Sequence, residues 1–228
     1  MSWNDAQQYC REKYTDLATF ESMDDINMLN STFSYSWAWI GLQDDPKSWQ
    51  NTLGSDTNYW RWAITGETSK TDYHNWYSTE PNSYGGNESC VTMGFEGWWF
   101  DINCGKNRSF VCYNVTEQNK KNYMYISTTK TWPSAREYCM KHSMDLAVIE
   151  NSEENAEVSS LKPSTGAVWI GLYRMPWTWS DKSQSSFKNW KSSKPDNDRG
   201  NEYCVAENNL HDAVLLETKF PRGTHPRD

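Results

Sequence analysis

The sequence predicts an α+β fold built from two tandem copies of one domain. The first observation is a repeat of four landmarks in one order, at offsets of 129, 130, 114 and 114 residues. Such a series identifies a duplication, with a longer loop in the first copy. The second observation is that each copy has stretches of helical spacing followed by short strands. The landmarks are Trp3–Cys10 and Trp132–Cys139, Trp39–Leu42 and Trp169–Leu172, Asn75-Trp76 and Asn189-Trp190, and Asn87–Cys90 and Asn201–Cys204.

Each element of the first copy has a local signal. Ser2 and Asp5 form a capping-box pattern ahead of apolar residues at helical spacing, which predicts a first helix. Ser22 with Asp25 predicts the start of a second helix. The apolar run 39–42 predicts a short buried strand. A long polar region rich in Trp follows, and we expect two more strands near residues 89–94 and 110–113.

The repeat also sets the expected domain limits. We place the first copy at 1–115, a linker at 116–121, the second copy at 122–207 and a non-matching tail at 208–228. An alternating aromatic strand opens the second copy at 122–126, whereas none precedes Trp3. Nothing after Cys204 resembles the end of the first copy. We therefore expect a first copy without its N-terminal strand and a second copy that is truncated at its C-terminus.

Composition and charge exclude several classes of function. The net charge is −8 and no Lys/Arg run occurs, which argues against a nucleic-acid or anionic-membrane partner. No apolar stretch approaches the ~20 residues of a transmembrane helix. The histidines are scattered and no nucleophile motif is present, so we expect no enzyme. The 14 Trp residues are expected mainly in small cores, with Trp60 and Trp98 as candidates for exposure.

Cysteines and glycosylation sequons indicate an extracellular protein. Six cysteines occur without a Cys-x-x-Cys motif or zinc spacing, which favours disulfides. Four Asn-x-Ser/Thr sequons also suit an oxidising, secretory compartment. Because no signal peptide precedes Trp3, we expect the chain to be a fragment of a secreted protein or receptor ectodomain. The expected glycosylation sites are Asn30, Asn87, Asn107 and Asn114.

The stretch Glu80–Cys90 carries the strongest chemical signal. It places Glu80, Asn82 and Glu88 around a proline and two glycines, just before a cysteine. Carboxylate and amide oxygens are the ligands that calcium selects, and it needs about six to eight of them. Further on, Asp101 follows an aromatic run and precedes Cys104.

This pattern resembles the C-type lectin domain family, and the tandem copies resemble those of macrophage mannose receptor-like proteins. In that family a Glu-Pro-Asn loop, a later Glu and a Trp-Asn-Asp triplet build a sugar-binding calcium site. The resemblance implies that Glu80, Asn82, Glu88 and Asp101 bind both Ca²⁺ and sugar, with a cis proline between the first two. The Glu-Pro-Asn order implies glycans with mannose, N-acetylglucosamine or fucose. It also implies disulfides Cys10–Cys112 and Cys90–Cys104.

Two departures from the family pattern leave alternatives open. Phe100 stands where the family has the Asn of the triplet, which removes one calcium oxygen. In the second copy Lys194 replaces the first ligand, so calcium binding there is not expected. The main hypothesis is calcium-dependent glycan binding by the first copy. The alternatives are a calcium-independent protein-binding domain, or an incomplete product whose Cys139 and Cys204 lack partners.

Overall fold

The computed structural model describes residues 1–32, 35–44, 59–196, 202–208 and 215–219. The chain forms two compact units that do not coincide with the two sequence copies. Unit 1 contains Met1–Pro46 and Pro176–Asp228, and unit 2 contains Lys47–Met175. Each unit therefore combines the N-terminal half of one copy with the C-terminal half of the other. The copies predicted at 1–115 and 122–207 are sequence repeats, not the compact units.

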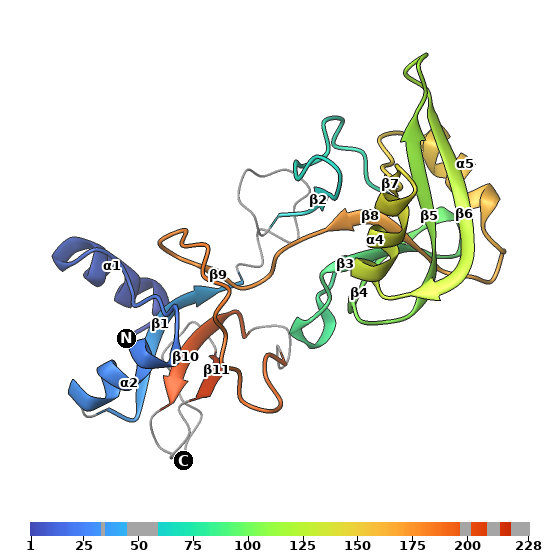
Figure 1. Cartoon of the computed structure of the whole chain (residues 1–228). Coiled ribbons are helices and arrows are strands. Elements are labelled where there is room, and N and C mark those ends of the chain that lie inside the picture. Colours follow the sequence, from blue (N-terminus) through green and yellow to red (C-terminus); the bar gives the residue numbers. More distant parts are fainter. Residues whose placement is uncertain (33–34, 45–58, 197–201, 209–214, 220–228) are drawn as a thin grey trace. The chain divides into compact units, whose positions relative to one another are not determined.

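Unit 2 is organised around a mixed sheet in the order β4-β3-β8-β5-β6, with β2 added to β8 and β7 to β5. The key strand is β8, from the second copy, which pairs antiparallel with β3 and parallel with β5 of the first copy. Figure 1 shows this exchange as an orange strand among green ones. The strands are β2 (Arg61–Trp62), β3 (Cys90–Met93), β4 (Trp99–Ile102), β5 (Arg108–Val115), β6 (Lys121–Lys130), β7 (Asp145–Leu146) and β8 (Val168–Tyr173).

The two copies are joined in unit 2 by a long hairpin of β5 and β6. Their register runs from Arg108↔Lys130 to Val115↔Lys121. The turn closes with a hydrogen bond from the Thr116 N–H to the Lys120 carbonyl (2.8 Å). The aromatic strand expected at 122–126 is thus part of β6. The segment predicted as a linker is the hairpin turn and the first residue of β6.

Among its described residues, unit 2 has the helices α4 (Trp132–Lys141) and α5 (Ser152–Leu161) and the single 3₁₀ turns η1 (Tyr84–Gly86) and η2 (Phe95–Gly97). Asn151 caps α5 by accepting a hydrogen bond from the Glu154 N–H (2.8 Å). The Trp132 indole of α4 donates to the Ile170 carbonyl of β8 (2.8 Å), which fixes the helix on the sheet. Buried aromatic side chains, including Trp60, Trp62 and Trp99, form much of the core.

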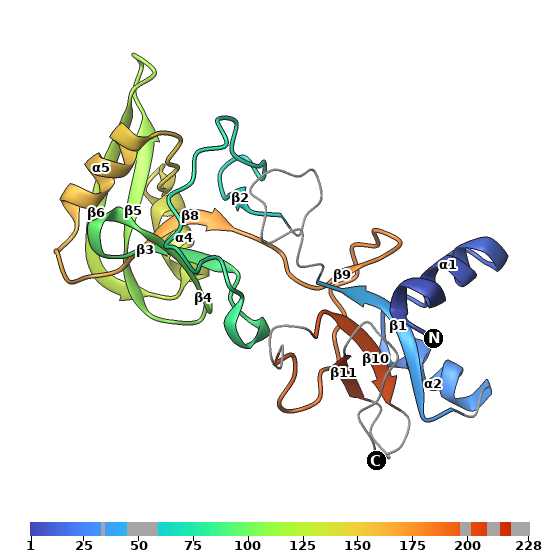
Figure 2. The same ribbon diagram turned by 180° about the vertical axis from the view of Figure 1, so that it is seen from behind.

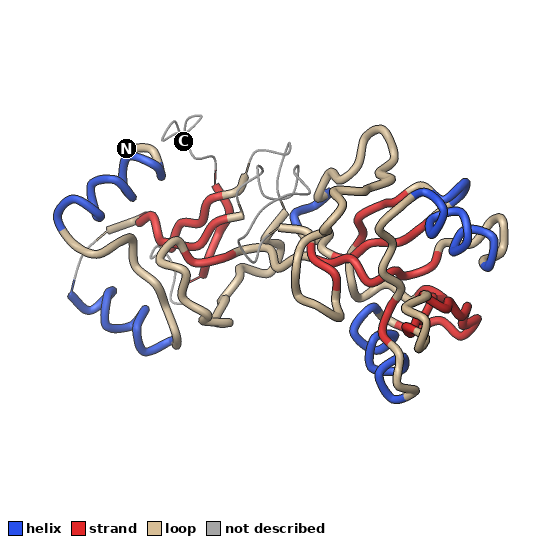
Figure 3. Tube along the Cα trace, turned by 90° about the horizontal axis from the view of Figure 1, so that it is seen from above, coloured by secondary structure: helices blue, strands red, loops and turns tan. Residues whose placement is uncertain are grey.

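Unit 1 has the same plan with fewer strands in its described part. Its sheet has the order β11-β10-β1-β9. The predicted capping box of Ser2 and Asp5 is confirmed at the start of α1. The Trp3 indole donates to the Ile40 carbonyl (2.8 Å), as Trp132 does to Ile170. The elements are α1 (Trp3–Lys13), α2 (Met23–Thr32), β1 (Trp37–Gln43), β9 (Thr178–Trp179), β10 (Cys204–Asn208) and β11 (Leu215–Lys219), and Figures 2 and 3 show the helices beside the strands.

Strand β11 corrects one expectation from the sequence. The tail was expected to match nothing in the first copy, yet β11 pairs with β10 as β4 pairs with β3. Trp190 bridges Leu216 as Trp76 bridges Trp99. The residue equivalent to Asp101 is therefore Thr218, which lies opposite Val205 as Asp101 lies opposite Val91. Sequence comparison missed this strand because only its backbone pairing is retained.

The disulfides also differ from the expected pattern. Cys90–Cys104 is present as predicted, but the predicted Cys10–Cys112 bond is wrong. Cys112 of β5 bonds instead to Cys139 of α4, with their Cα atoms 5.6 Å apart. The physical reason is the hairpin: β5 continues through β6 into α4, so the helix packed beside β5 belongs to the second copy. Cys139 thus has a partner, while Cys10 keeps a free thiol in unit 1.

Candidate functional site

The loop between Glu80 and Glu88 in unit 2 is held by the buried carboxylate of Asp101 on β4. Asp101 Oδ1 accepts the Asn82 N–H (3.0 Å) and Oδ2 accepts the Ser83 N–H (2.8 Å). The Glu80-Pro81 peptide bond is cis, as the resemblance implies. The fold therefore brings the loop and β4 together, and Asp101 is only 2% exposed at their contact.

Glu80 lies beside Asp101 in an environment that disfavours its charge. Its Oε1 accepts a hydrogen bond from Asn82 Nδ2 (2.7 Å), whereas its Oε2 is buried and has no hydrogen-bond partner. Burial, followed by the adjacent Asp101 carboxylate and the charge of Glu88, raises the pKa of Glu80 to about 8. A hydrogen bond between the Glu80 and Asp101 carboxyls needs a proton on one of them, and the two groups repel each other when both are ionised.

Glu88 completes the acidic group from the other end of the loop. Its Oε2 accepts the Tyr84 N–H (2.8 Å), which stabilises the ionised form. Burial and the charge of Asp101 nevertheless raise the pKa of Glu88 to about 7. Two carboxyls with raised pKa values next to a third carboxylate are the arrangement that a bound cation would relieve.

The donor set fits a hard cation, although the side chains are not drawn together around one point. In the described ranges, no three His, Cys, Asp or Glu side chains form a ready-made metal site. All four predicted ligands nevertheless supply oxygen, and the orphaned Oε2 of Glu80 is a buried acceptor without a donor. These residues fit Ca²⁺ better than a transition metal, because no thiolate or imidazole lies among them.

Phe100 packs with an aromatic cluster. Its ring stacks on Tyr77 (centroids 5.3 Å apart) and lies 5.8 Å from the ring of Phe95. A Cβ on Gly94 would meet the Phe100 ring at 2.7 Å, so the ring lies directly over this glycine. Trp98 joins the same cluster through Tyr77. We call Tyr77, Phe95, Trp98 and Phe100 the aromatic cluster.

A hollow of about 500 Å³ lies next to the loop. Glu88 and Asn87 line it from the loop, and Tyr84 lines it with a side chain that is 80% exposed. Lys106 and Arg108 line it from the segment that enters β5. The hollow therefore offers aromatic, amide and cationic groups beside the candidate ligands.

The predicted glycosylation and aromatic positions can now be placed. Three of the sequon asparagines, at 87, 107 and 114, are exposed, and the side chain of Asn30 lies outside the described residues. Trp60, a candidate for exposure, is buried at 1%, whereas Trp98 is half-buried. Trp62 and Trp99 are fully buried as expected, and Trp39 and Trp76 pack partly buried against core clusters.

The corresponding loop in unit 1 already contains its own cation. Lys194 Nζ lies 2.7 Å from Asp196 Oδ1 and 3.1 Å from Glu202 Oε2. The Thr218 hydroxyl lies 2.8 Å from the same Glu202 oxygen. Burial alone would lower the pKa of Lys194, but its hydrogen bonds with the two carboxylates raise it. An ammonium thus neutralises the acidic residues, and the lack of calcium binding at this loop stays a prediction.

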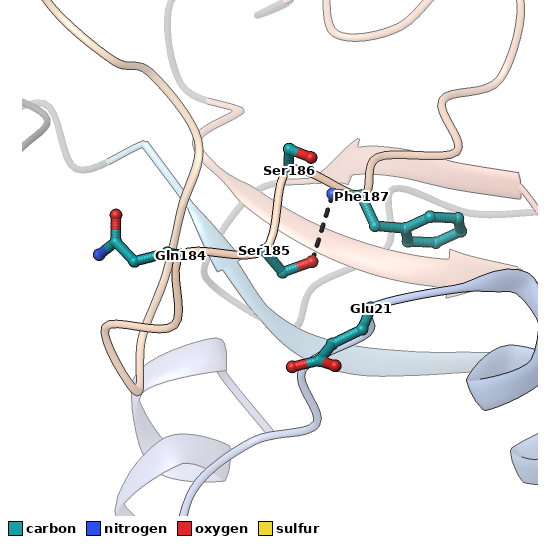
Figure 4. A pocket seen from close by; sticks show the side chains of 5 residues that line it. All are labelled: Glu21, Gln184, Ser185, Ser186 and Phe187. Carbon is teal, nitrogen blue, oxygen red and sulfur yellow. Dashed lines mark hydrogen bonds between the residues drawn. The ribbon is translucent and has the colours of Figure 1, made fainter.

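A second hollow in unit 1, of about 400 Å³, is shallow and polar. Figure 4 shows Glu21 on one side and Gln184, Ser185, Ser186 and Phe187 on the other. The Ser185 hydroxyl is used internally: it donates to the Phe20 carbonyl (2.7 Å) and accepts the Phe187 N–H (3.2 Å). These hydrogen bonds shape the turn, and the hollow shows no cluster of chemically reactive groups.

The profile of the Lectin C-type domain family matches residues 1–114 and 128–214. The chain belongs to the C-type lectin domain family. Similar proteins include E-selectin of Rattus norvegicus (31% identical over 126 residues; 52% of this chain and 21% of that protein). L-selectin of Bos taurus is 27% identical over 170 residues, covering 72% of this chain and 38% of that protein. The secretory phospholipase A2 receptor of Bos taurus is 26% identical over 224 residues, covering 85% and 15%.

These relatives are longer proteins, of which the chain spans 15% to 38%. Among the described residues, no helix has the length and apolar character needed to cross a membrane. Within the C-type lectin pattern, sequence reasoning found the four candidate ligands but missed Thr218. Only strand pairing shows that Thr218 is the equivalent of Asp101, because a hydroxyl side chain does not resemble a carboxylate.

Proposed function

We propose that the chain binds Ca²⁺ through Glu80, Asn82, Glu88 and Asp101 of unit 2 and uses this site to recognise glycans. The observation that carries the proposal is the buried Glu80 Oε2, which has no hydrogen-bond donor and belongs to a carboxyl group beside that of Asp101. A bound calcium ion would supply positive charge and coordination positions for sugar hydroxyls. Membership of the C-type lectin family supports the same conclusion.

The chain's own residues would do the remaining work. The N–H groups of Asn82 and Ser83 each donate a hydrogen bond to the carboxylate of Asp101, which fixes the position of its oxygens. Glu80 and Glu88 would lose their protons on binding, because the positive ion would stabilise their charged forms. The same oxygens, together with the Asn82 amide, would hydrogen-bond two neighbouring sugar hydroxyls.

The proposed sugars follow from the order of the loop residues. Glu80-Pro81-Asn82 has the order that, in the C-type lectins it resembles, favours mannose, N-acetylglucosamine and fucose. The hollow beside Glu88 gives room for a second sugar residue, and Tyr84 offers a ring face at its edge. We propose an extracellular glycan-binding role without catalysis, supported by the two disulfides and the exposed sequons.

Calcium titration of the full chain tests the proposal. Calcium that binds only the native state must raise the melting temperature and shift the tryptophan fluorescence. Glu88→Gln should abolish both effects. The matched control is Glu117→Gln, an exposed glutamate in the hairpin turn of the same unit, which should leave both unchanged. A folded chain that is indifferent to millimolar calcium would overturn the proposal.

Sugar selectivity is tested on the same protein. Replacing Glu80 and Asn82 by Gln and Asp together should shift monosaccharide competition from mannose toward galactose. Unchanged selectivity in a variant that still binds calcium would exclude this loop as the sugar site.

One observation favours a second candidate function, binding of a protein without calcium. The aromatic cluster is partly on the surface, with Tyr77 37% and Phe95 49% exposed. Adjacent exposed aromatic rings are typical of protein contact surfaces. Under this alternative, Phe95→Ser would abolish partner binding while Glu88→Gln would not, and calcium chelation would have no effect.

A further inference from the structure

Arg174 is a buried cation directly beneath the candidate calcium loop. It follows β8 in the second sequence copy and is 2% exposed. Its Nη2 donates to the Ser83 hydroxyl (2.9 Å), and its guanidinium carbon lies 5.7 Å from the centroid of the Trp60 ring. Its backbone N–H donates to the Ser89 carbonyl (3.0 Å). Arg174 therefore contacts the loop near both of its ends.

Ser83 is the residue through which this contact reaches the site. It has φ 48° and ψ 44°, a left-handed conformation that is unfavourable for a non-glycine residue. Surrounding contacts must hold it there. Its N–H donates to Asp101 Oδ2 (2.8 Å), and its carbonyl accepts the Gly86 N–H (2.9 Å). Arg174, Ser83 and Asp101 thus form a continuous chain of hydrogen bonds.

We propose that Arg174 is a positioning residue for the calcium and glycan loop, so that the two sequence copies build one site together. This inference rests on the proposed function of the loop. Arg174 donates a hydrogen bond to the hydroxyl of Ser83, which lies next to the predicted ligand Asn82. It acts through Ser83, fixing the backbone turn whose two N–H groups hold Asp101.

Comparison of the repeats shows that this role depends on the second copy's β8 lying beside the first copy's loop in unit 2. The first-copy residue equivalent to Arg174 is Asp44, two positions after Leu42 as Arg174 is after Leu172. The Asp44 N–H donates to the Tyr203 carbonyl of unit 1 (2.9 Å), as the Arg174 N–H does to Ser89. A carboxylate in the place of Arg174 would have no hydrogen to donate to the Ser83 hydroxyl and would add a further negative charge to an acidic loop.

The test uses the full chain and compares the buried Arg174 with Arg136, a half-buried arginine of the same unit. Arg174→Met removes the donor while keeping the apolar stem. The control, Arg136→Met, removes hydrogen bonds to Asp145 and to the Ala63 carbonyl, away from the loop. We expect Arg174→Met to weaken calcium binding about 5- to 20-fold, a part of what a buried charged hydrogen bond contributes. Arg136→Met should lower the melting temperature without changing calcium affinity.

Ser83→Ala separates positioning from general stability. It should weaken calcium binding as Arg174→Met does, and the double variant should be no weaker than the weaker single variant, because both remove the same bond. Arg174→Lys should restore part of the affinity. An Arg174→Met chain with wild-type calcium affinity would overturn the inference, as would additive losses in the double variant.

A readout that needs no calcium distinguishes failure of the inference from failure of the proposed function. In calcium-free protein, the amides of Asn82 and Ser83 should exchange with solvent faster in Arg174→Met than in Arg136→Met. If wild-type chain binds no calcium, the proposed function fails, and amide exchange still decides the role of Arg174. Equal exchange in the two variants would refute it.

Discussion

The hydrogen bond between Asn155 of α5 and Trp99 of β4 allows a quantitative test of the exchanged units. Asn155 Oδ1 accepts the Trp99 indole N–H (2.8 Å), and both side chains are buried. The repeat places Ile26 in the equivalent position of α2, and strand pairing places Leu216 in that of Trp99; both lie in one apolar cluster of unit 1. The contact between helix and strand is therefore polar in unit 2, with Asn155 on Trp99, and apolar in unit 1, with Ile26 and Leu216 in one cluster.

The perturbation is Asn155→Ile, which gives unit 2 the residue of unit 1. It leaves the Trp99 N–H buried without a partner, at a cost of about 1–3 kcal/mol. The Gly97 carbonyl, which also accepts from Asn155, keeps its hydrogen bond from Asn75 Nδ2 (2.7 Å) and adds little. Apolar burial of the isoleucine returns about 1 kcal/mol. We therefore expect a net loss of up to about 2 kcal/mol in the free energy of unfolding.

The assay is urea unfolding of wild type, Asn155→Ile, Trp99→Phe and the double variant. Trp99→Phe removes the N–H, so the double variant should be more stable than the sum of the single effects predicts, by about 1–2 kcal/mol. Strictly additive effects of the two substitutions would show that α5 of the second copy does not pack on β4 of the first. The mirror variant Ile26→Asn should destabilise unit 1 by burying an amide among apolar side chains.

Three further predictions follow from the ionisable groups and the disulfides. Burial and the neighbouring Asp101 raise the pKa of Glu80 to about 8, so the native chain binds this proton more tightly than the unfolded chain does. Without calcium, the chain should therefore lose stability as the pH rises from about 4.5 to 8. Melting temperatures measured in a chelator should show this loss in the wild type and a smaller loss in Glu80→Gln. Calcium should remove that loss. Lys194→Met should lower the free energy of unfolding, measured in urea, by about 1–3 kcal/mol, because Asp196 and Glu202 lose the ammonium that neutralises them. Unchanged stability would contradict the ion-pair assignment. Peptide mapping without reduction should recover Cys112 linked to Cys139, with Cys10 alkylated, and recovery of a Cys10–Cys112 peptide would instead indicate that each copy folds on itself.

Local sequence was enough to predict the elements of each copy. Capping at Ser2, the apolar run of β1 and the alternating start of β6 depend on neighbours in the chain, and the structure shows all three. The candidate ligands were also visible, because residue type and spacing alone identify an oxygen-rich loop before a cysteine. Family membership followed from the same pattern and is supported by the profile match.

Sequence alone did not determine which half of the chain packs with which. Both copies carry the same strand and helix patterns, so either pairing satisfies the local signals equally. The decision depends on a few long-range contacts: Cys112 with Cys139, Asn155 with Trp99, and Arg174 with Ser83. Each joins a residue of one copy to a residue of the other, and in the last two the equivalent residue, Ile26 or Asp44, lacks the side-chain group that forms the bond. Packing and hydrogen bonding between distant segments therefore place the second copy's Arg174 against the first copy's loop. No local sequence pattern records such contacts.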